Sequence, residues 1–538
     1  MSVTAPAPTD AGSQDDRLRK GLGFWGLTAI GFSNIFGSGW LFSAMYAAQT
    51  AGPAALISWV IAGLLCLLIA LVMVQLGASR PAGGGTVRWP RQSNGQLVAS
   101  VVGVSVLLTV GGTAAEVTAI LGYADHYLPW LQSGDGTLTV RGVLVAMGLA
   151  LVLSALNWFG VRLFASFNNV ITVVKFVVPV LTVVALLASG FHPAHLHDHG
   201  GFAPYGYGAV LSALAVGGIV YSVNGFQAAA DFSGEARNPA RDVPRAIVAA
   251  IVLSVGAYLL LQLAFLFAVP DSLLGHGWHG VDFNSPFGKL ALILNLQWLS
   301  ALLYADAVVS PGGSAFVGVA VDARHTYALA ANRVLPRFFL AVEQRSGIPR
   351  RALLLNLAVI LVFLLPFSGW QQIVSVVGDL YLLTYAAVAV SAAVLTTDDA
   401  DGDVRIARWV PPIPVLAPLS FVAATEFVYW SGWHDLRIAL SLTLVGVPLY
   451  LVAGRGRSRR ATVDGLWQGA WIVGYLLVLL AVSAAGSFGG HDVLGSPWDS
   501  VVVAAVGVVT YVAAVASGRR ARTVSQTADP AATADPRP

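Results

Sequence analysis

Long apolar stretches recur along this chain from residue 22 to residue 517. Each is close to the ~20 residues that a helix needs to cross the ~30 Å hydrocarbon core of a membrane. The composition agrees, because 56% of the 538 residues are hydrophobic and only 11% are charged. Soluble domains carry about 25% charged residues, so this composition excludes them as a class. The sequence therefore predicts an all-α protein that crosses a membrane many times.

Hydropathy and length predict about fourteen spans. When the N-terminus is placed in the cytosol, all but four of the 30 Lys and Arg residues lie in or beside cytosolic segments. This asymmetry follows the positive-inside rule, and we expect a plasma-membrane protein with both termini cytosolic. The predicted spans are residues 22–49, 53–79, 96–127, 142–159, 167–190, 207–233, 243–269, 286–323, 352–366, 371–395, 410–430, 436–453, 465–485 and 501–517.

The chain is predicted to be one membrane unit between two disordered tails. Residues 1–21 and 518–538 are rich in small and polar residues and lack an apolar period. Between them we expect a core of about twelve helices over 22–453 and two additional helices over 464–517. The charged residues directly before the first span argue against a secretory signal. The net charge of +3 gives no reason to expect a nucleic acid partner.

Cysteine and histidine usage argues against a metal or cofactor. The single cysteine, Cys66, lies in an apolar run, where we expect it to pack in the core or against lipid. One cysteine excludes an intrachain disulfide and a thiolate metal site. Residues 192–199 contain histidines at short spacing, a pattern that some metal-binding tracts share. We interpret this segment as a solvated external loop and expect no metal and no cofactor.

The first predicted span is interrupted in its middle by Gly37, Ser38 and Gly39. Glycine weakens a helix interior, and backbone groups freed inside a membrane must find partners. The interruption therefore predicts either a cavity lined by backbone amides and carbonyls or a close crossing of two helices through small residues.

The sixth predicted span carries a second interruption, from Gly217-Gly218 to Asn224-Gly225. Interrupted helices in corresponding positions indicate an inverted repeat whose halves share one site near the middle of the membrane. We expect the two repeats at residues 22–190 and 207–395.

Four segments along the chain carry recognisable motifs: Ser33–Trp40, Asn157–Pro179, Gly234–Ile247 and Tyr327–Phe338. Together they resemble the amino acid–polyamine–organocation (APC) superfamily of permeases. A short motif around Asp306 and 310–313 is similar to its aspartate–proton symporter branch. The resemblance covers about residues 22–453 and implies a LeuT-type 5+5 inverted repeat with discontinuous helices 1 and 6. It also implies transport of an amino acid.

The same resemblance implies a substrate site at the two interruptions. Backbone amides of the first interruption would bind the substrate carboxylate, and nearby carbonyls would bind its ammonium group. Tyr221 stands where the family often has an aromatic gate. Gln227 stands where some proton-linked exchangers carry a glutamate, so a carboxylate gate is in doubt here. The implied substrate-binding residues are Asn34, Ile35, Gly37, Ser38, Gly39, Tyr221, Ser222, Asn224 and Gly225.

Ionisable residues inside the spans are candidates for coupling transport to protons. Lys175 lies well inside span five, where a lysine faces the bundle interior by default. In relatives without a sodium site such a lysine resembles a built-in substitute for the ion; the alternative is a fixed cation paired for packing. Asp306, Glu116, Asp231 and Asp379 also lie within spans and are costly to bury as charges, so each is expected to be protonated, paired or hydrated. Asp306 is the first candidate among these acids, as proton partner or substrate contact. Glu116 and Asp231 are weaker candidates, and the alternative for Asp379 is pairing within its helix bundle.

We therefore expect a secondary transporter that moves an amino acid by alternating access, coupled to protons, with the bilayer as its surroundings. One alternative is an amino acid or polyamine exchanger on the same fold, which would depend on counter-substrate rather than on a proton gradient. Another is a sensor that does not transport. An enzyme is not expected, because the spans contain no cluster of nucleophile and base or of metal ligands.

Overall fold

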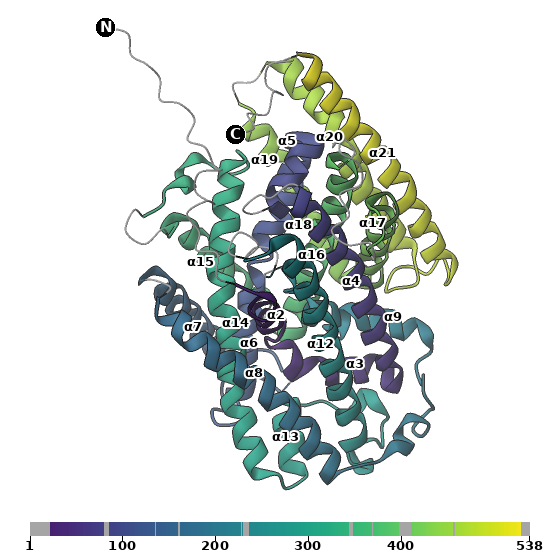
Figure 1. Ribbon diagram of the computed structural model, residues 1–538. Coiled ribbons are helices and arrows are strands. Elements are labelled where there is room, and N and C mark those ends of the chain that lie inside the picture. The colour runs from purple at the N-terminus through teal and green to yellow at the C-terminus, as the bar shows by residue number, and fades with distance from the viewer. Residues whose placement is uncertain are drawn as a thin grey trace.

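Long helices dominate the computed structural model of this chain, and most of them run between two opposite ends of one bundle (Figure 1). The structure describes residues 22–79, 85–134, 136–159, 162–227, 229, 236–343, 348–367, 369–396, 410–455 and 458–528. The α-helices are α2 (Phe24–Ile35), α3 (Gly39–Ala51), α4 (Ala55–Ser79), α5 (Gly85–Leu108), α6 (Gly111–Ala124), α7 (Val140–Phe159), α8 (Arg162–Ser189), α9 (Tyr207–Val216), α10 (Ile219–Val223), α12 (Pro239–Ala268), α13 (Pro286–Ile293), α14 (Gln297–Ala331), α15 (Arg350–Phe363), α16 (Trp370–Leu395), α17 (Ile413–Trp430), α18 (Trp433–Leu444), α19 (Gly446–Ala453), α20 (Arg459–Ala485) and α21 (Trp498–Ala528). Short 3₁₀ helices are η1 (Gly52–Ala54), η2 (Pro193–Leu196), η4 (Asp271–Leu273), η5 (Trp278–Gly280) and η6 (Arg337–Leu340).

Eleven helical segments among the described residues are long and apolar enough to cross a membrane. The predicted count of about fourteen is therefore not confirmed. The predicted spans without a long segment of their own are the first, the sixth and the ninth. The first and sixth are divided by their interruptions into α2 with α3 and α9 with α10, and the ninth corresponds to α15, a helix of 14 residues.

Two predicted boundaries differ from the structure. The third predicted span begins at residue 96, whereas α5 begins at Gly85 and bends at Gly95, whose φ is +82°. The C-terminal tail was expected to be disordered from residue 518, but α21 continues to Ala528. Residues 518–528 contain arginine and alanine, which favour helix, and no proline. The predicted N-terminal tail, 1–21, and Asp231 lie outside the described residues.

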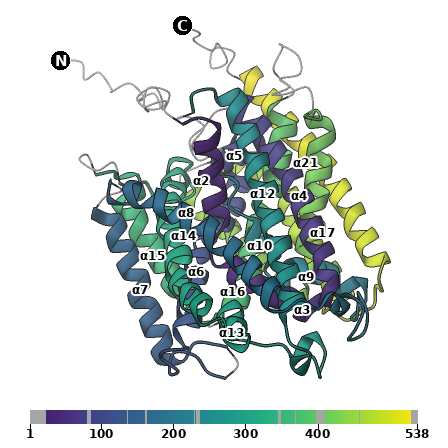
Figure 2. The same ribbon diagram turned by 60° about the horizontal axis from the view of Figure 1, so that its bottom comes forward.

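The bundle has two ends, which we name by their residues. The arginine face contains Leu22, Arg237, Val87 and Asn332: the Arg237 amide donates to the Leu22 carbonyl at 2.8 Å, and the Asn332 side chain donates to the Val87 carbonyl at 2.8 Å. The start of α2 and the end of α21 lie together at this end (Figure 2).

The opposite end, the histidine face, includes η2, η4 and the loop before α13. There the Gln49 side chain donates to the Val281 carbonyl at 2.7 Å, and the Asn284 side chain donates to Asp125 at 3.3 Å. Since the first and last described helices both reach the arginine face, the chain crosses the bundle an even number of times.

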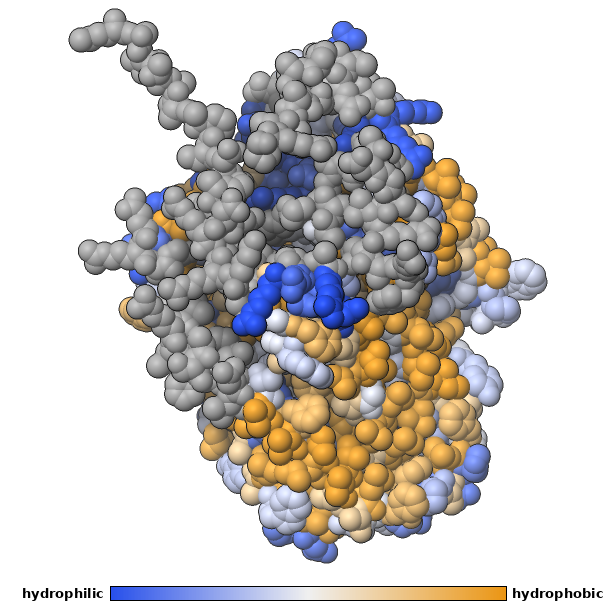
Figure 3. Space-filling view, viewed as in Figure 1, coloured by the Kyte–Doolittle hydropathy of each residue, from blue (hydrophilic) through white to orange (hydrophobic). Residues whose placement is uncertain are grey.

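The lateral surface of the bundle is apolar. Figure 3 shows hydrophobic residues over the lower and right-hand parts of the coloured surface, with hydrophilic residues at its lower edge and around its upper part. Exposed side chains of α8 and α21 contribute to the lateral surface of the molecule, among them Phe176 and Val509. A surface of this kind is stable against lipid, in agreement with the predicted membrane environment.

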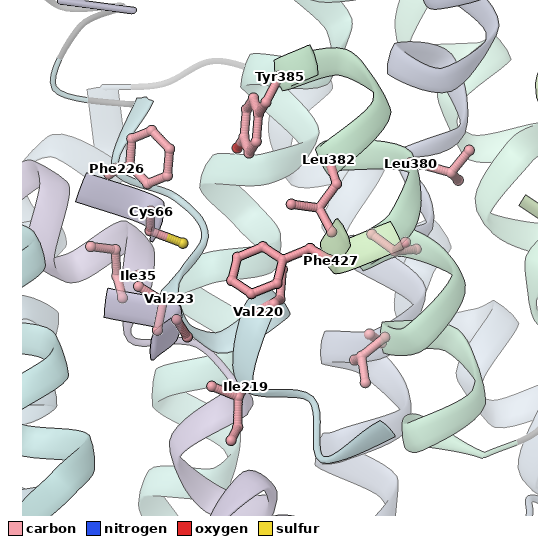
Figure 4. Packing of buried hydrophobic residues seen from close by; sticks show 14 of the residues in the cluster. Ile35, Cys66, Ile219, Val220, Val223, Phe226, Leu380, Leu382, Tyr385 and Phe427 are labelled. Atoms are coloured by element: carbon pink, nitrogen blue, oxygen red, sulfur yellow. The ribbon is translucent and has the colours of Figure 1, made fainter. Parts of the chain in front are cut away.

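The core joins the two interrupted helices to their neighbours. Figure 4 shows Ile35 at the end of α2 and Val223 at the end of α10 beside Cys66 of α4. Cys66 is 2% exposed, so of its two expected environments the structure supports the core. Both interruptions are thus held at fixed positions by close packing around their helix ends.

Candidate functional site

The first interruption separates two half-helices that meet in the middle of the bundle. Helix α2 ends at Ile35 and α3 begins at Gly39, so Phe36, Gly37 and Ser38 connect them. The end of α2 presents unpaired carbonyls, and the start of α3 presents unpaired amides. Their partial charges are of opposite sign, about −0.5 and +0.5 of an elementary charge. The interruption therefore offers separate positions for a cation and an anion.

The anion position at the start of α3 is taken by Glu116 of α6. Its Oε2 accepts a hydrogen bond from the Ser38 amide at 2.7 Å, and its Oε1 accepts from the Tyr221 hydroxyl at 3.0 Å. Glu116 is 6% exposed. A Cβ on Gly37 would lie 3.0 Å from the Glu116 Cδ and would also contact its Oε1, so only glycine allows this approach. A carboxylate at a helix N-terminus is stabilised by the dipole and by the free amides.

The cation position at the end of α2 is taken by Lys175 of α8. Its Nζ donates to the Ser33 carbonyl at 2.8 Å and to the Ser314 hydroxyl at 2.7 Å. The Ser314 hydroxyl lies 3.3 Å from the Phe36 carbonyl, to which it donates. Lys175 is 1% exposed. The ammonium group thus satisfies the Ser33 carbonyl directly and reaches the Phe36 carbonyl through Ser314, at the end of α2 where a cation is favoured.

The second interruption is held by uncharged groups. Helix α9 ends at Val216, Gly218 takes a φ of +69°, and the short helix α10 ends at Val223. The Ser43 and Ser222 hydroxyls are 2.7 Å apart, and the Ser222 hydroxyl donates to the Gly218 carbonyl at 2.7 Å. These contacts join α10 to α3.

Beyond α10 the chain is extended and remains close to the first interruption. Gly225 has a φ of +115°, and the Asn34 side chain donates to its carbonyl at 3.0 Å. The Tyr385 hydroxyl contacts the side-chain oxygens of Asn224 and Gln227. A Cβ on Gly225 would lie 2.8 Å from the Asn34 carbonyl oxygen, so the two interrupted segments approach at backbone distance.

A cavity of about 90 Å³ lies between the two interruptions. Its lining combines backbone of both interrupted segments with polar side chains of α6, α14 and α16. The lining residues are Asn34, Ile35, Gly37, Gly39, Thr109, Gly112, Thr113, Glu116, Tyr221, Asn224, Gly225, Gln227, Ser314, Ala315, Gly318, Val321, Asp322, His325 and Tyr381.

The cavity extends toward the arginine face and is covered on its other side. Asp322 and His325 line it toward the end of α14 that reaches the arginine face. Toward the histidine face, the Trp370 ring stacks on Phe42 at 5.0 Å and on Tyr46 at 5.8 Å between ring centroids. The Trp370 indole also donates to the Ser38 hydroxyl at 2.8 Å. The structure therefore has a layer of aromatic rings on one side of the site and polar groups on the other.

Most residues predicted for the substrate site line this cavity, but four predicted site residues do not. The Ser38 and Ser222 side chains are bonded to Trp370 and Ser43 instead. Lys175 lies behind the lining, on the carbonyls of α2. Asp306 is 2% exposed and accepts from Ser310 at 2.8 Å; it lies eight residues before Ser314, about 12 Å along α14.

Gly39 combines the two alternatives that the sequence left open. It lines the cavity, yet a Cβ there would lie 2.7 Å from the Ser222 Cβ and 2.9 Å from its Cα. The interruption is therefore a cavity wall at Gly37 and also a close crossing of α3 with α10 at Gly39. Asp379 accepts from Ser431 at 2.9 Å and does not line the cavity.

Sequence reasoning missed the contribution of the helices around the interruptions. Helix α5 ends at Leu108 and α6 begins at Gly111, and Thr109, Gly112 and Thr113 of this junction line the cavity. The adjacent glycines 111 and 112 were the available signal. Asp322 and His325 had no comparable signal, because each reads as an ordinary polar residue near a helix end.

The family model described as amino acid permease matches residues 22–453, which is most of the chain and the range over which the motifs resemble the APC superfamily. This chain belongs to the amino acid permease family. Members of this family are transporters and not enzymes, and the match supports the expected fold, membrane environment and amino acid transport.

Three bacterial relatives illustrate what this permease is similar to, all from Bacillus subtilis (strain 168). The glutamate/serine transporter AimA is 36% identical, over 94% of this chain and 95% of its own length. The aspartate-proton symporter is 32% identical, over 93% of this chain and 96% of its own length. The branched-chain amino acid permease BcaP is 24% identical, over 84% of this chain and 96% of its own length.

Proposed function

We propose that this permease moves a small polar or acidic amino acid across the plasma membrane together with protons. The names of two relatives describe transport of glutamate, serine and aspartate, one of them with protons. The cavity of about 90 Å³ suits a small ligand, since a water needs about 10–15 Å³ by the same measure, giving room for roughly six to nine waters. Hydroxyl and amide groups of Thr109, Thr113 and Gln227 line it and offer partners for a polar side chain.

The observation that carries the proposal is the carboxylate of Glu116 at the start of α3, 2.7 Å from the Ser38 amide. An amino acid that bound there through its own carboxylate would need the same amides. Two carboxylates at one site repel, unless one of them takes up a proton. Protonation of Glu116 therefore frees the amides for the substrate. Proton binding raises substrate affinity, and by linkage substrate binding raises proton affinity equally.

Lys175 has a different part in this proposal. Its ammonium group stabilises the carbonyl end of α2, and it does so only while it carries a proton. Loss of that proton would weaken the hold on Ser33 and Phe36 and favour another position of α2. A group of this kind shifts a two-state equilibrium through its different interaction with each state. Asp306, two turns away on α14, remains a further candidate for carrying a proton.

The test measures two activities of the Glu116→Gln variant in proteoliposomes: exchange of substrate across the membrane, and accumulation of substrate under an imposed pH gradient. Glutamine keeps the shape of the side chain and cannot ionise, so the variant should bind and exchange substrate but should not accumulate it under a pH gradient. The matched control is Glu426→Gln, a buried acid of α17 that does not line the cavity. Accumulation by Glu116→Gln equal to the parent would contradict the role of Glu116. Uptake by the parent that follows counter-substrate and ignores the pH gradient would instead favour an exchanger.

We also propose that the arginine face lies in the cytosol, together with both termini. Basic residues gather there, as the positive-inside rule requires. A reporter inserted after Arg460 should then report the cytosol, and one inserted in the loop of residues 192–199 should report the outside. Opposite localisation of either reporter would reverse the orientation.

A further inference from the structure

The loop after α8 carries histidines that were expected to be solvated, but one of them is buried. His195, in η2, is 1% exposed. Its Nδ1 lies 2.9 Å from the Leu266 carbonyl at the end of α12, and its Nε2 lies 2.8 Å from Oδ1 of Asp271 in η4. The ring is therefore fixed between the two segments and points Nε2 at a carboxylate.

Both ring nitrogens of His195 face oxygen atoms that only accept hydrogen bonds. A neutral imidazole has one N–H, so it can satisfy the Leu266 carbonyl or the Asp271 carboxylate, but not both. If the imidazole N–H is on Nδ1, the Nε2 and Oδ1 atoms repel each other unless a second proton or a metal cation lies between them. Metal-bound histidines commonly donate a hydrogen bond from the N–H of their other ring nitrogen to a backbone carbonyl, and the Leu266 carbonyl lies in the position to accept one from Nδ1.

A second histidine converges on the same carboxylate oxygen. The His199 Nε2 lies 3.2 Å from Asp271 Oδ1. The three candidate ligand atoms, from His195, His199 and Asp271, lie within 4.8 Å of one another. His199 has a φ of +53°, a conformation uncommon for histidine, and this brings its ring to the cluster.

We propose that His195, His199 and Asp271 form a site for a divalent transition-metal cation such as Zn²⁺ on the histidine face. Imidazole nitrogen and carboxylate oxygen are ordinary zinc ligands, at about 2.0–2.2 Å, and water can complete the coordination. Tetrahedral ligands at these distances are about 3.3 Å apart. The two contacts of Asp271, at 2.8 and 3.2 Å, need to change by only a few tenths of an ångström, whereas the ligand atoms of the two histidines would have to approach by up to about 1.5 Å. The Asp271 and His199 side chains are 69% and 24% exposed, which leaves them room to move.

The site would fasten the loop after α8 to the end of α12. The backbone contact is already present, because the His192 amide donates to the Phe267 carbonyl at 3.1 Å. A metal ion would add bonds between segments separated by more than 70 residues and stabilise this part of the histidine face. The inference concerns a site apart from the cavity and does not depend on the proposed transport mechanism.

The experiment is a titration of the full-length purified protein with ZnCl₂, by calorimetry and by thermal unfolding, after chelation and with an affinity tag that contains no histidine. We expect saturable binding of one Zn²⁺ per chain and a higher unfolding temperature. His199→Ala and Asp271→Asn should each weaken binding by at least about tenfold. His197→Ala is the matched control, an exposed histidine of the same loop outside the cluster, and should bind Zn²⁺ like the parent.

Both test variants change exposed or partly exposed side chains, so the fold should be retained; equal unfolding temperatures in chelator would verify this. Absence of saturable Zn²⁺ binding by the parent would overturn the proposal and leave a proton between His195 and Asp271. Equal binding by the parent, His199→Ala and Asp271→Asn would also overturn it, because the ion would then be held elsewhere.

Discussion

The two interrupted helices have similar glycine-rich sequences but different chemistry. At the first interruption, an ionisable acid, Glu116, binds the amide end of α3, and an ionisable base, Lys175, binds the carbonyl end of α2. At the second, the half-helices are held by hydroxyl and amide groups, such as Ser222 and Asn224. At each interruption, side chains of neighbouring segments bond to polar groups of the broken helix ends.

The difference indicates that the two interruptions contribute differently to transport. Groups that gain or lose a proton hold the first interruption, whereas the second is held mostly by neutral groups and meets an ionisable one where Tyr221 donates to Glu116. We therefore expect substitutions at the first interruption to change the coupling to protons, and substitutions at the second to change affinity alone. Substitutions at Lys175, Gly39 and Tyr385 test this distinction.

The largest effect is expected for Lys175→Ala. Lys175 is the one basic side chain that the described part of the chain places on a carbonyl at the end of α2. Its removal should therefore abolish accumulation under a pH gradient while substrate still binds. Couplings of this kind are worth roughly 5–150-fold in affinity. The measurement is uptake in proteoliposomes with and without an imposed gradient. The control is Lys289→Ala, an exposed lysine of α13. Accumulation by Lys175→Ala at the level of the parent would make Lys175 a structural residue.

Gly39→Leu should have the next largest effect, because Gly39 joins the two interruptions. Its side chain would overlap Ser222, whose Cα lies 2.9 Å from the position of a Cβ. Overpacking of this kind costs about 1–3 kcal/mol of stability, and uptake should be abolished. Gly148→Leu in α7 is the matched control, since no atom lies within 4 Å of a Cβ there. Uptake with unchanged affinity in Gly39→Leu would show that the crossing of α3 and α10 does not shape the site.

The smallest effect is expected for Tyr385→Phe, at the second interruption. The change removes the hydroxyl that contacts Asn224 and Gln227 but keeps the ring that packs 5.6 Å from Phe226. Loss of one hydrogen bond is worth about 0.5–1.5 kcal/mol, so KM should rise roughly two- to twelvefold. Tyr475→Phe, a buried tyrosine of α20 bonded to Thr425, is the control. A loss of proton dependence in Tyr385→Phe would contradict the proposed division between the interruptions.

The sequence predicted the all-helical membrane fold and both interruptions, because each leaves a local signal. Apolar length identifies a span, and glycines at the middle of a span identify a break, as at Gly37 and Gly218. The partners of the broken ends could not be predicted this way, since they come from other helices. Glu116 was recognised as a buried acid, but its position on the Ser38 amide depends on how α6 packs against α3.

The histidine loop gives a second example of this limit. Residues 192–199 are predicted to form a solvated loop in spite of their histidine spacing, whereas the structure buries His195 against the end of α12. Asp271, which completes the cluster, lies 76 residues beyond His195 in the chain. A site formed by two distant segments leaves no periodic signal in either of them.

Tyr258 of α12 has a mechanical consequence for the transport cycle. Its hydroxyl lies 3.2 Å from the Ile35 carbonyl and 3.1 Å from the Ser222 carbonyl, so one side chain touches the broken end of α2 and the middle of α10. Gly39 of α3 also packs closely against Ser222 of α10. We therefore expect the half-helices of both interruptions to move together with α12 rather than independently. A proton that alters the first interruption would then displace the second as well, and neutral contacts would transmit an electrostatic signal.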